Sequence, residues 1–229
     1  MSSAYAALLQ RIAAAAQRAG RHVRLLAVSK TKPAAAIRDV AAAGQRAFGE
    51  NYVQEALAKQ PELTKLQLEW HMIGPLQSNK CREVAQHFDW LQSLDRAKLI
   101  APLHRFRSAD FTPLNVLIQV NIDDEASKSG CAPADVAALA QKIAAAPRLA
   151  LRGLMAIPKP TPDFDQRRRA FRHMHALFEE LRATHPGADT LSMGMSDDFE
   201  LAIEEGATMV RIGTAVFGAR AEKVVSHES

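Results

Sequence analysis

The feature that most restricts the fold of this 229-residue chain is a regular alternation of short apolar runs with longer helical stretches. Eight runs have the length and composition of buried strands: residues 23–30, 46–50, 68–74, 90–95, 115–122, 150–157, 190–196 and 209–214. Helical stretches separate them, and another, at about 3–19, precedes the first. Because strict strand–helix alternation implies parallel strands, the sequence predicts an α/β fold, a single-domain (β/α)8 TIM barrel over residues 1–229 with an extra N-terminal helix.

Composition indicates a cytoplasmic globular protein. Hydrophobic residues make up 48% of the chain, which is enough for a substantial core. No apolar run approaches the roughly 18 residues that cross a membrane, and the N-terminal region lacks the layout of a signal peptide. Two cysteines, Cys81 and Cys131, are too few for a disulfide framework, so free thiols are expected. The polar segment 219–229 has the composition of a disordered tail.

Charge does not single out a nucleic-acid partner. The net charge is +4, and the densest basic run is 167–169, with Arg172 following. This run could be a nucleic-acid patch or the solvated face of a long helix. Aromatic residues are only 6% of the chain and no nucleic-acid motif is present, which favours the helix face. No apolar patch is left over in the pattern, so we expect a monomer.

A lysine stands at the carboxyl end of the first predicted strand. Lys30 closes the run 23–30, and loops at this end of barrel strands carry the chemistry of barrel enzymes. Partial desolvation favours the neutral amine, which is a nucleophile for a carbonyl. Taken alone, such a residue is more often a surface lysine just past a strand. Lys32 is a competing amine, but its place beyond the strand, next to Pro33, predicts that it is more solvated.

Two glycine-containing segments, 192–198 and 211–215, follow the seventh and eighth strands. Barrels commonly bind phosphate between these loops, where backbone amides and hydroxyl groups converge. We expect Asp197 to cap the next helix in a capping box with Glu200. The charges of Asp197 and Asp198 work modestly against an anion there. The alternative is a plain turn. The candidate anion-binding residues are Ser196, Gly213 and Thr214, and Met195 is a further candidate for contact with a bound ligand.

An arginine shares the inward side of the eighth strand with Gly213 by period-two alternation. Arg211 would need a partner inside the barrel, either a carboxylate such as Glu50 or a ring nitrogen of a bound heterocycle. Strands one and eight are neighbours in a closed barrel, so Lys30 and Arg211 should line one pocket. An amine, an anion-binding site between segments 192–198 and 211–215, and a guanidinium together fit pyridoxal 5′-phosphate (PLP). Its aldehyde would form an imine with Lys30, its phosphate would bind between the two segments, and Arg211 would donate a hydrogen bond to the pyridine nitrogen.

Two further polar residues are weaker candidates. Asn51 follows the second strand, and His71 lies in the third. Each could touch a ligand, and each is as easily explained as a structural polar group. The histidines show no metal-ligand spacing, and no dinucleotide, Walker or nucleophile-elbow motif is present.

The chain also resembles the pyridoxal phosphate homeostasis protein family. The resemblance is carried, in order, by residues 27–33, 48–55, 71–80, 120–130, 153–158, 191–198 and 210–218. It implies a barrel of the alanine racemase N-terminal type and a PLP imine on Lys30. It also implies phosphate contacts from Ser196, Gly213 and Thr214 and a pyridine contact from Arg211. Family members are described as carriers or regulators without established catalysis, so PLP-dependent apoenzymes are possible partners.

Three functions compete at this point. The first is PLP binding and intracellular delivery without catalysis. The second is a PLP-dependent enzyme resembling an amino-acid racemase. A racemase of this fold type carries a second, β-rich domain that completes its site, and none follows the eighth strand here, so we expect no enzyme activity. The third is a cofactor-free barrel isomerase with Glu50 as its base.

Overall fold

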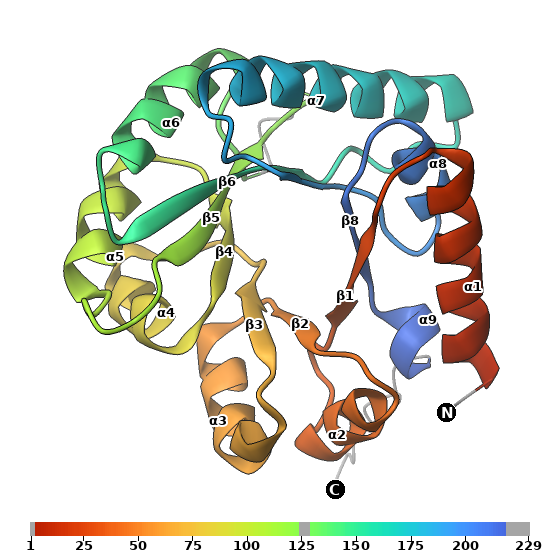
Figure 1. Cartoon of the computed structure of the whole chain (residues 1–229), viewed down its shortest axis with the longest axis horizontal. Coiled ribbons are helices and arrows are strands. Elements are labelled where there is room, and N and C mark those ends of the chain that lie inside the picture. The colour runs from red at the N-terminus through yellow and green to blue at the C-terminus, as the bar shows by residue number, and fades with distance from the viewer. Residues whose placement is uncertain (1–2, 124–128, 219–229) are drawn as a thin grey trace, which may run out of the picture.

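Eight parallel strands close into a barrel in the order in which they occur along the chain. The computed structural model describes residues 3–123 and 129–218 (Figure 1). Strands β1 and β8 pair to close the ring, with Leu26 beside Arg211. The predicted (β/α)8 barrel is therefore confirmed. The strands are β1 (Arg24–Val28), β2 (Ala47–Glu50), β3 (Glu69–Met72), β4 (Trp90–Leu94), β5 (Leu114–Val120), β6 (Leu149–Ala156), β7 (Thr190–Ser192) and β8 (Met209–Ile212).

Helices form a ring around the strands (Figure 1). They are α1 (Ser3–Arg18), α2 (Ala34–Ala42), α3 (Val53–Leu63), α4 (Cys81–His87), α5 (Ile100–Phe106), α6 (Val136–Ala144), α7 (Phe164–Thr184), α8 (Phe199–Glu204) and α9 (Thr214–Phe217). Short 3-10 turns are η1 (Thr64–Leu66), η2 (Ser78–Lys80), η3 (Ala97–Leu99) and η4 (Pro133–Asp135). The extra helix α1 lies beside α8 and α9, near the β1–β8 seam (Figure 1).

Helix α7 shows why these sequences form the outer layer. Asp163 caps its first turn by accepting bonds from the amides of Asp165 and Gln166. The helix then buries one stripe, whose residues recur at helical spacing as the sequence predicted: Phe171, Met174, Phe178 and Leu181. Burial of this stripe against the barrel wall fixes the helix in place.

The basic run of α7 forms ion pairs on the protein surface. Arg172 and Arg168 both lie within 2.9 Å of the Glu205 carboxylate, and Arg169 lies 3.9 Å from Asp163. These pairs agree with the solvated helix face predicted for this run. Within residues 3–123 and 129–218, no helix is both long and apolar enough to traverse a bilayer. The predicted tail 219–229 lies outside the described residues.

All strands except β2 end earlier than the sequence predicted, and the ends of β1 and β7 bear on the site. Strand β1 stops at Val28, where its register with β2 ends, and Thr31 then turns the chain with φ 63°. Lys30 therefore lies in a turn, past the strand end. Strand β7 stops at Ser192, where its register with β8 ends, so Met195 lies in the following loop.

The predicted capping box at the start of α8 is wrong. Asp198, and not Asp197, is the residue before the helix, and its Oδ1 accepts from the Met195 amide at 2.7 Å. Glu200 instead binds Arg11 of α1. The Asp198 carboxylate therefore closes the loop on itself and leaves the helix start uncapped.

Candidate functional site

The turn after β1 presents a lysine amine that is not engaged by the rest of the described chain. Lys30 is half-buried, and its amine forms no hydrogen bond or ion pair within residues 3–123 and 129–218. The competing amine of Lys32 donates to the Gly218 carbonyl at 3.3 Å. Of the two amines, Lys30 is therefore the one available for a ligand.

A buried ionic cluster outside the barrel wall holds this turn. The Lys59 amine donates to the Ser29 carbonyl at 3.0 Å, to Glu50 Oε1 at 2.9 Å and to Glu55 Oε1 at 2.6 Å. Ser29 Oγ also donates to Glu50 at 2.6 Å, and the Thr31 amide donates to Glu55. Burial raises the pKa of the Glu50 carboxyl, and the bonds from Ser29 and Lys59 offset part of that effect. Because both strand end and turn are bonded to this cluster, the backbone that carries Lys30 is held in position.

Arg211 is a buried cation inside the barrel. It is 4% exposed, and it donates to Ser192 Oγ and to the Ala156 carbonyl, each at 2.8 Å. Within the described residues its guanidinium forms no bond to a carboxylate; the suggested partner Glu50 lies outside the wall with Lys59. Burial lowers the pKa of Arg211 to about 10, so it stays charged near neutral pH. A buried guanidinium with remaining N–H groups suits an electron-rich ring nitrogen or an anion.

The loops after β7 and β8 lie side by side at the same end of the barrel. The Arg211 amide donates to the Gly194 carbonyl at 3.0 Å, which joins the loop after β7 to strand β8. Gly213 packs closely on β1, and a Cβ there would lie 3.2 Å from the Val28 carbonyl oxygen. The glycine thus brings the backbone of one loop against the strand that leads to Lys30.

Polar groups of these two loops remain accessible. Ser196 is half-buried and Thr214 is exposed, and their hydroxyl groups bond no other described residue. The backbone amides of Ser196, Asp197, Gly213 and Thr214 likewise donate to no partner in the part of the chain that the structure describes. Amides and hydroxyls of this kind can bind a phosphate.

Asn51 follows strand β2, and Met195 lies in the loop after β7. Asn51 is half-buried directly after β2. Met195 is 36% exposed and lines a hollow of about 330 Å³ together with Pro158, Pro160 and Asp197. A ligand at the carboxyl end of the barrel could contact the amide of Asn51 and the thioether of Met195.

His71 lies deeper than the strand ends. It is fully buried and stacks on Trp90, with ring centroids 5.1 Å apart and planes inclined by 11°. Its Nε2 bonds Glu69 at 2.7 Å, and its Nδ1 bonds Gln92 at 2.9 Å. Burial lowers the pKa of His71, and the bond to Glu69 opposes that effect. Gln92 and Ser192 were missed from the sequence, although a polar residue at an inward position of an apolar strand could have signalled each of them.

Comparison with known proteins identifies the family of this chain. The alanine racemase N-terminal domain family matches residues 4–221. The pyridoxal phosphate homeostasis protein of Pseudomonas aeruginosa is 59% identical over 213 residues, which are 92% of this chain and 91% of that protein. The protein of the same name from Escherichia coli K12 is 55% identical over 216 residues, 92% of each chain.

The chain belongs to the pyridoxal phosphate homeostasis protein family. A solved structure similar to this family member is PipY of Synechococcus elongatus PCC7942 with PLP bound. The TM-score is 0.81 and the identity 41%, over 91% of this chain and 99% of PipY. Alanine racemase of Corynebacterium glutamicum shares the fold, with a TM-score of 0.65 and 21% identity over 97% of this chain and 64% of the racemase.

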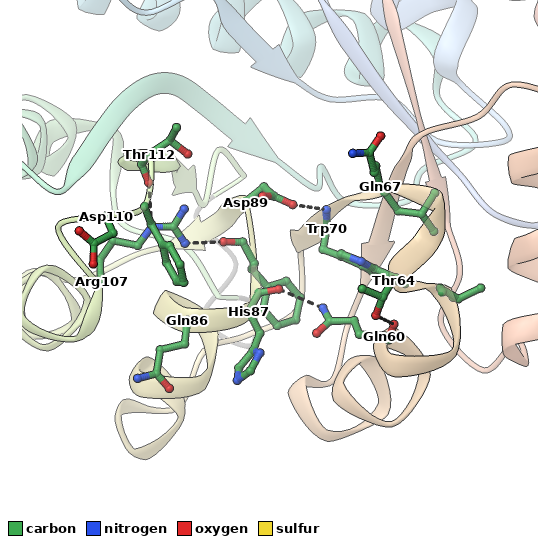
Figure 2. A pocket seen from close by; sticks show the side chains of 14 residues that line it. Gln60, Thr64, Gln67, Trp70, Gln86, His87, Asp89, Arg107, Asp110 and Thr112 are labelled. Atoms are coloured by element: carbon green, nitrogen blue, oxygen red, sulfur yellow. Dashed lines mark hydrogen bonds between the residues drawn. The ribbon is translucent and has the colours of Figure 1, made fainter.

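A second hollow of this family member, of about 500 Å³, lies at the opposite end of the barrel (Figure 2). Trp70 at the start of β3, Asp89 before β4 and Thr112 before β5 line it. Arg107 crosses its edge and donates to the carbonyls of Ala85 and Phe88, each at 2.8 Å, and of Thr112 at 2.9 Å. These bonds tie loops at the amino ends of the strands. The hollow contains none of the residues predicted for the site.

Proposed function

We propose that this protein binds PLP at the carboxyl end of its barrel and acts in the intracellular homeostasis and delivery of the cofactor, without catalysis. One observation carries the proposal. The unpartnered Lys30 amine follows β1, and the buried Arg211 guanidinium, which bonds no carboxylate among the described residues, lies on the adjacent strand β8. The chain is 41% identical to a protein solved with PLP bound.

Each residue has a distinct role in holding the cofactor. PLP supplies an aldehyde, and the Lys30 amine is the group that attaches to it. The ionic cluster behind the turn, with Lys59 at its centre, keeps that amine at the pocket mouth. Arg211 donates to the ring nitrogen and, because it remains a cation, keeps that nitrogen unprotonated.

The loops after β7 and β8 hold the phosphate. Ser196 and Thr214 donate through their hydroxyl groups, and the amide of Gly213 can approach an oxygen closely because the residue has no side chain. Asn51 and Met195 flank the ring. His71 is buried below this layer and affects the ligand through other residues rather than by contact.

Two side chains with the chemistry of a general base, Glu50 and His71, are engaged elsewhere. Glu50 is bound by Ser29 and Lys59 outside the barrel wall. Both ring nitrogens of His71 are bonded inside it. A positioned base contributes roughly 10²–10⁴ to the rate of proton transfer, and neither of these two groups is placed to supply it. The engaged state of both groups supports carriage of PLP over turnover, and it leaves Glu50 without a role as an isomerase base.

The visible absorbance of the purified protein tests the assignment. PLP added to the wild-type protein should give a band that borohydride removes, with the added mass on the peptide that contains Lys30. Lys30→Ala should abolish the band and the labelled peptide, and the matched variant Lys32→Ala should retain both. An unchanged spectrum in Lys30→Ala would reject Lys30 as the attachment point.

Two further assays separate delivery from catalysis. Protein loaded with PLP should restore activity to a PLP-dependent apoenzyme, and the borohydride-treated protein should not. Incubation with a panel of amino acids, followed by chiral analysis of the products, should show no change in configuration. Turnover of any of these amino acids would favour the racemase-like alternative.

A further inference from the structure

A chain of hydrogen bonds crosses the interior of the barrel beneath Arg211. Arg211 donates to Ser192 Oγ at 2.8 Å, and Ser192 Oγ donates to Gln92 Oε1 at 2.7 Å. Gln92 Nε2 lies 2.9 Å from His71 Nδ1, and His71 Nε2 lies 2.7 Å from Glu69 Oε1. Ser192 is on β7 and Gln92 is on β4, so the chain spans the barrel from wall to wall. Ser192, Gln92 and His71, at the centre of the chain of bonds, are fully buried. The loss of any bond between them would therefore leave a buried polar group unsatisfied and lower the stability of the protein.

The direction of every bond is fixed by chemistry. A guanidinium only donates, so Ser192 Oγ accepts from Arg211 and its single proton goes to Gln92 Oε1. The Gln92 amide nitrogen then faces His71 Nδ1 and also the Met209 sulfur, at 3.1 Å. The opposite amide orientation would set an oxygen against that sulfur, which is itself only a weak acceptor, and would leave the serine proton without an acceptor.

This direction determines the state of the histidine. Because Gln92 Nε2 donates to Nδ1, His71 Nδ1 must be unprotonated and its proton must lie on Nε2, facing Glu69. Arg24 also donates to Glu69 Oε1, at 2.6 Å, so the far end of the chain is a carboxylate held by two donors. Although burial opposes it, the bond from His71 and the charge of Arg24 lower the pKa of Glu69 and keep it ionised.

We propose that His71 and Gln92 are positioning residues for Arg211: a neutral His71 protonated on Nε2 orients the Gln92 amide, which orients the Ser192 hydroxyl, which holds the guanidinium. The inference deepens the proposed function and rests on it, since Arg211 is the group assigned to the cofactor ring nitrogen. The chain thus links a half-buried carboxylate near the amino ends of the strands to the floor of the cofactor pocket.

Residue 71 must present a hydrogen-bond acceptor to the Gln92 amide. A donor facing Gln92 would turn the amide over, so that its nitrogen faced Ser192 Oγ. The hydroxyl would then receive donors from both Gln92 and Arg211 and would have no acceptor for its own proton. A buried hydroxyl proton would remain unsatisfied, and the Ser192 hydroxyl that contacts the guanidinium would no longer be held in one orientation. An acceptor at this place is therefore required, whereas the imidazole ring itself is not.

The first test needs no cofactor. In protein labelled with ¹⁵N-histidine and free of PLP, the resonance pair that disappears in His71→Asn should be that of a neutral ring protonated on Nε2. A ring protonated on Nδ1, or on both nitrogens, at neutral pH would overturn the inference. This result is independent of PLP binding, so failure of the proposed function alone leaves it intact.

The second test compares two substitutions at the same position. An asparagine side chain would keep an acceptor toward Gln92, so His71→Asn should bind PLP within about twofold of wild type and with the same band maximum. His71→Leu removes the acceptor and should weaken PLP binding about fivefold, the effect of one lost hydrogen bond, with a shifted band. Leu117→Val is the control, because Leu117 is buried in the same interior beside Trp90 but outside the chain of bonds.

The outcomes separate positioning from stability. If His71→Leu and His71→Asn shift the band and the dissociation constant equally, or if Leu117→Val shifts the band as His71→Leu does, the inference fails. If the wild-type protein shows no PLP band at all, the proposed function fails, and the histidine resonances still decide the direction of the bonds.

Discussion

Replacement of Lys59 by methionine tests how the turn that carries Lys30 is held. The Lys59 side chain is 10% exposed and Glu50 is fully buried. The substitution keeps an apolar stem of similar length and removes the only cation bonded to Glu50 among the described residues. Glu50 would retain the bond from Ser29 at 2.6 Å, and its Oε2, which already has no partner, would remain unsatisfied.

The expected loss is large because a buried charge is left uncompensated. Removal of one partner of a buried ion pair costs about 3–5 kcal/mol of unfolding free energy. For a domain of this size each kcal/mol lowers the melting temperature by roughly 2–4 °C, so Lys59→Met should melt roughly 6–20 °C below wild type. Lys65 is exposed on the next turn, and Lys65→Met should change stability by no more than about 0.5 kcal/mol.

The pH dependence of the loss has a definite sign. Burial already raises the pKa of Glu50, and without Lys59 the pKa should rise further. A carboxyl with a higher pKa in the folded than in the unfolded protein binds its proton more tightly when folded. Stability of the variant therefore falls as pH rises from the unfolded pKa through the folded one. The deficit of Lys59→Met should be smallest at acid pH and largest near neutrality.

Urea unfolding of the three proteins, followed by far-ultraviolet circular dichroism at several pH values, measures these effects. The double variant Lys59→Met with Glu50→Gln should recover at least half of the loss, because it removes the stranded charge. PLP binding should weaken in Lys59→Met while the visible band persists, since Lys30 is still present. A variant that unfolds within about 0.5 kcal/mol of wild type at neutral pH would refute the reasoning.

Two other predictions concern the barrel wall. Gly153→Ala should lower the unfolding free energy by about 3 kcal/mol or more, because φ is 139° and a Cβ would lie 1.9 Å from the Thr190 carbonyl oxygen; thermal melting measures this, and an unchanged melting temperature would contradict it. Burial raises the pKa of the Cys131 thiol to about 12 and also raises that of Cys81. A thiol reagent at pH 8 should modify neither cysteine in the folded protein and both after denaturation, and rapid labelling of the folded protein would show that these thiols are accessible.

The sequence predicted the barrel because its signals are local. Each strand is an apolar run of the right length, and the helix that begins at Phe164 repeats its buried residues at helical spacing. The inward direction of Arg211 also followed from alternation along a single strand, and its burial confirms it. The cofactor contacts of Lys30 and its companions remain predictions.

Contacts between distant elements could not be predicted from such local signals. Ser192 and Gln92 meet only because β4 and β7 face each other across a closed barrel, and no local pattern encodes that distance. Lys59 reaches Ser29 because α3 packs on the outside of β1 and β2. The early end of β1 depends on where its ladder with β2 stops, which is a property of the pair and not of residues 23–30 alone.

The neighbours of α1 have a consequence for how the chain is made. Its apolar stripe is Tyr5, Leu8, Ile12 and Ala15, and Arg11 on the same helix binds Glu200, 189 positions later. On the ribosome this helix is synthesised well before its partners α8 and α9. The apolar stripe therefore stays exposed to solvent, where chaperones can bind it, until the barrel closes. Folding of this protein should accordingly be slow and dominated by long-range contacts.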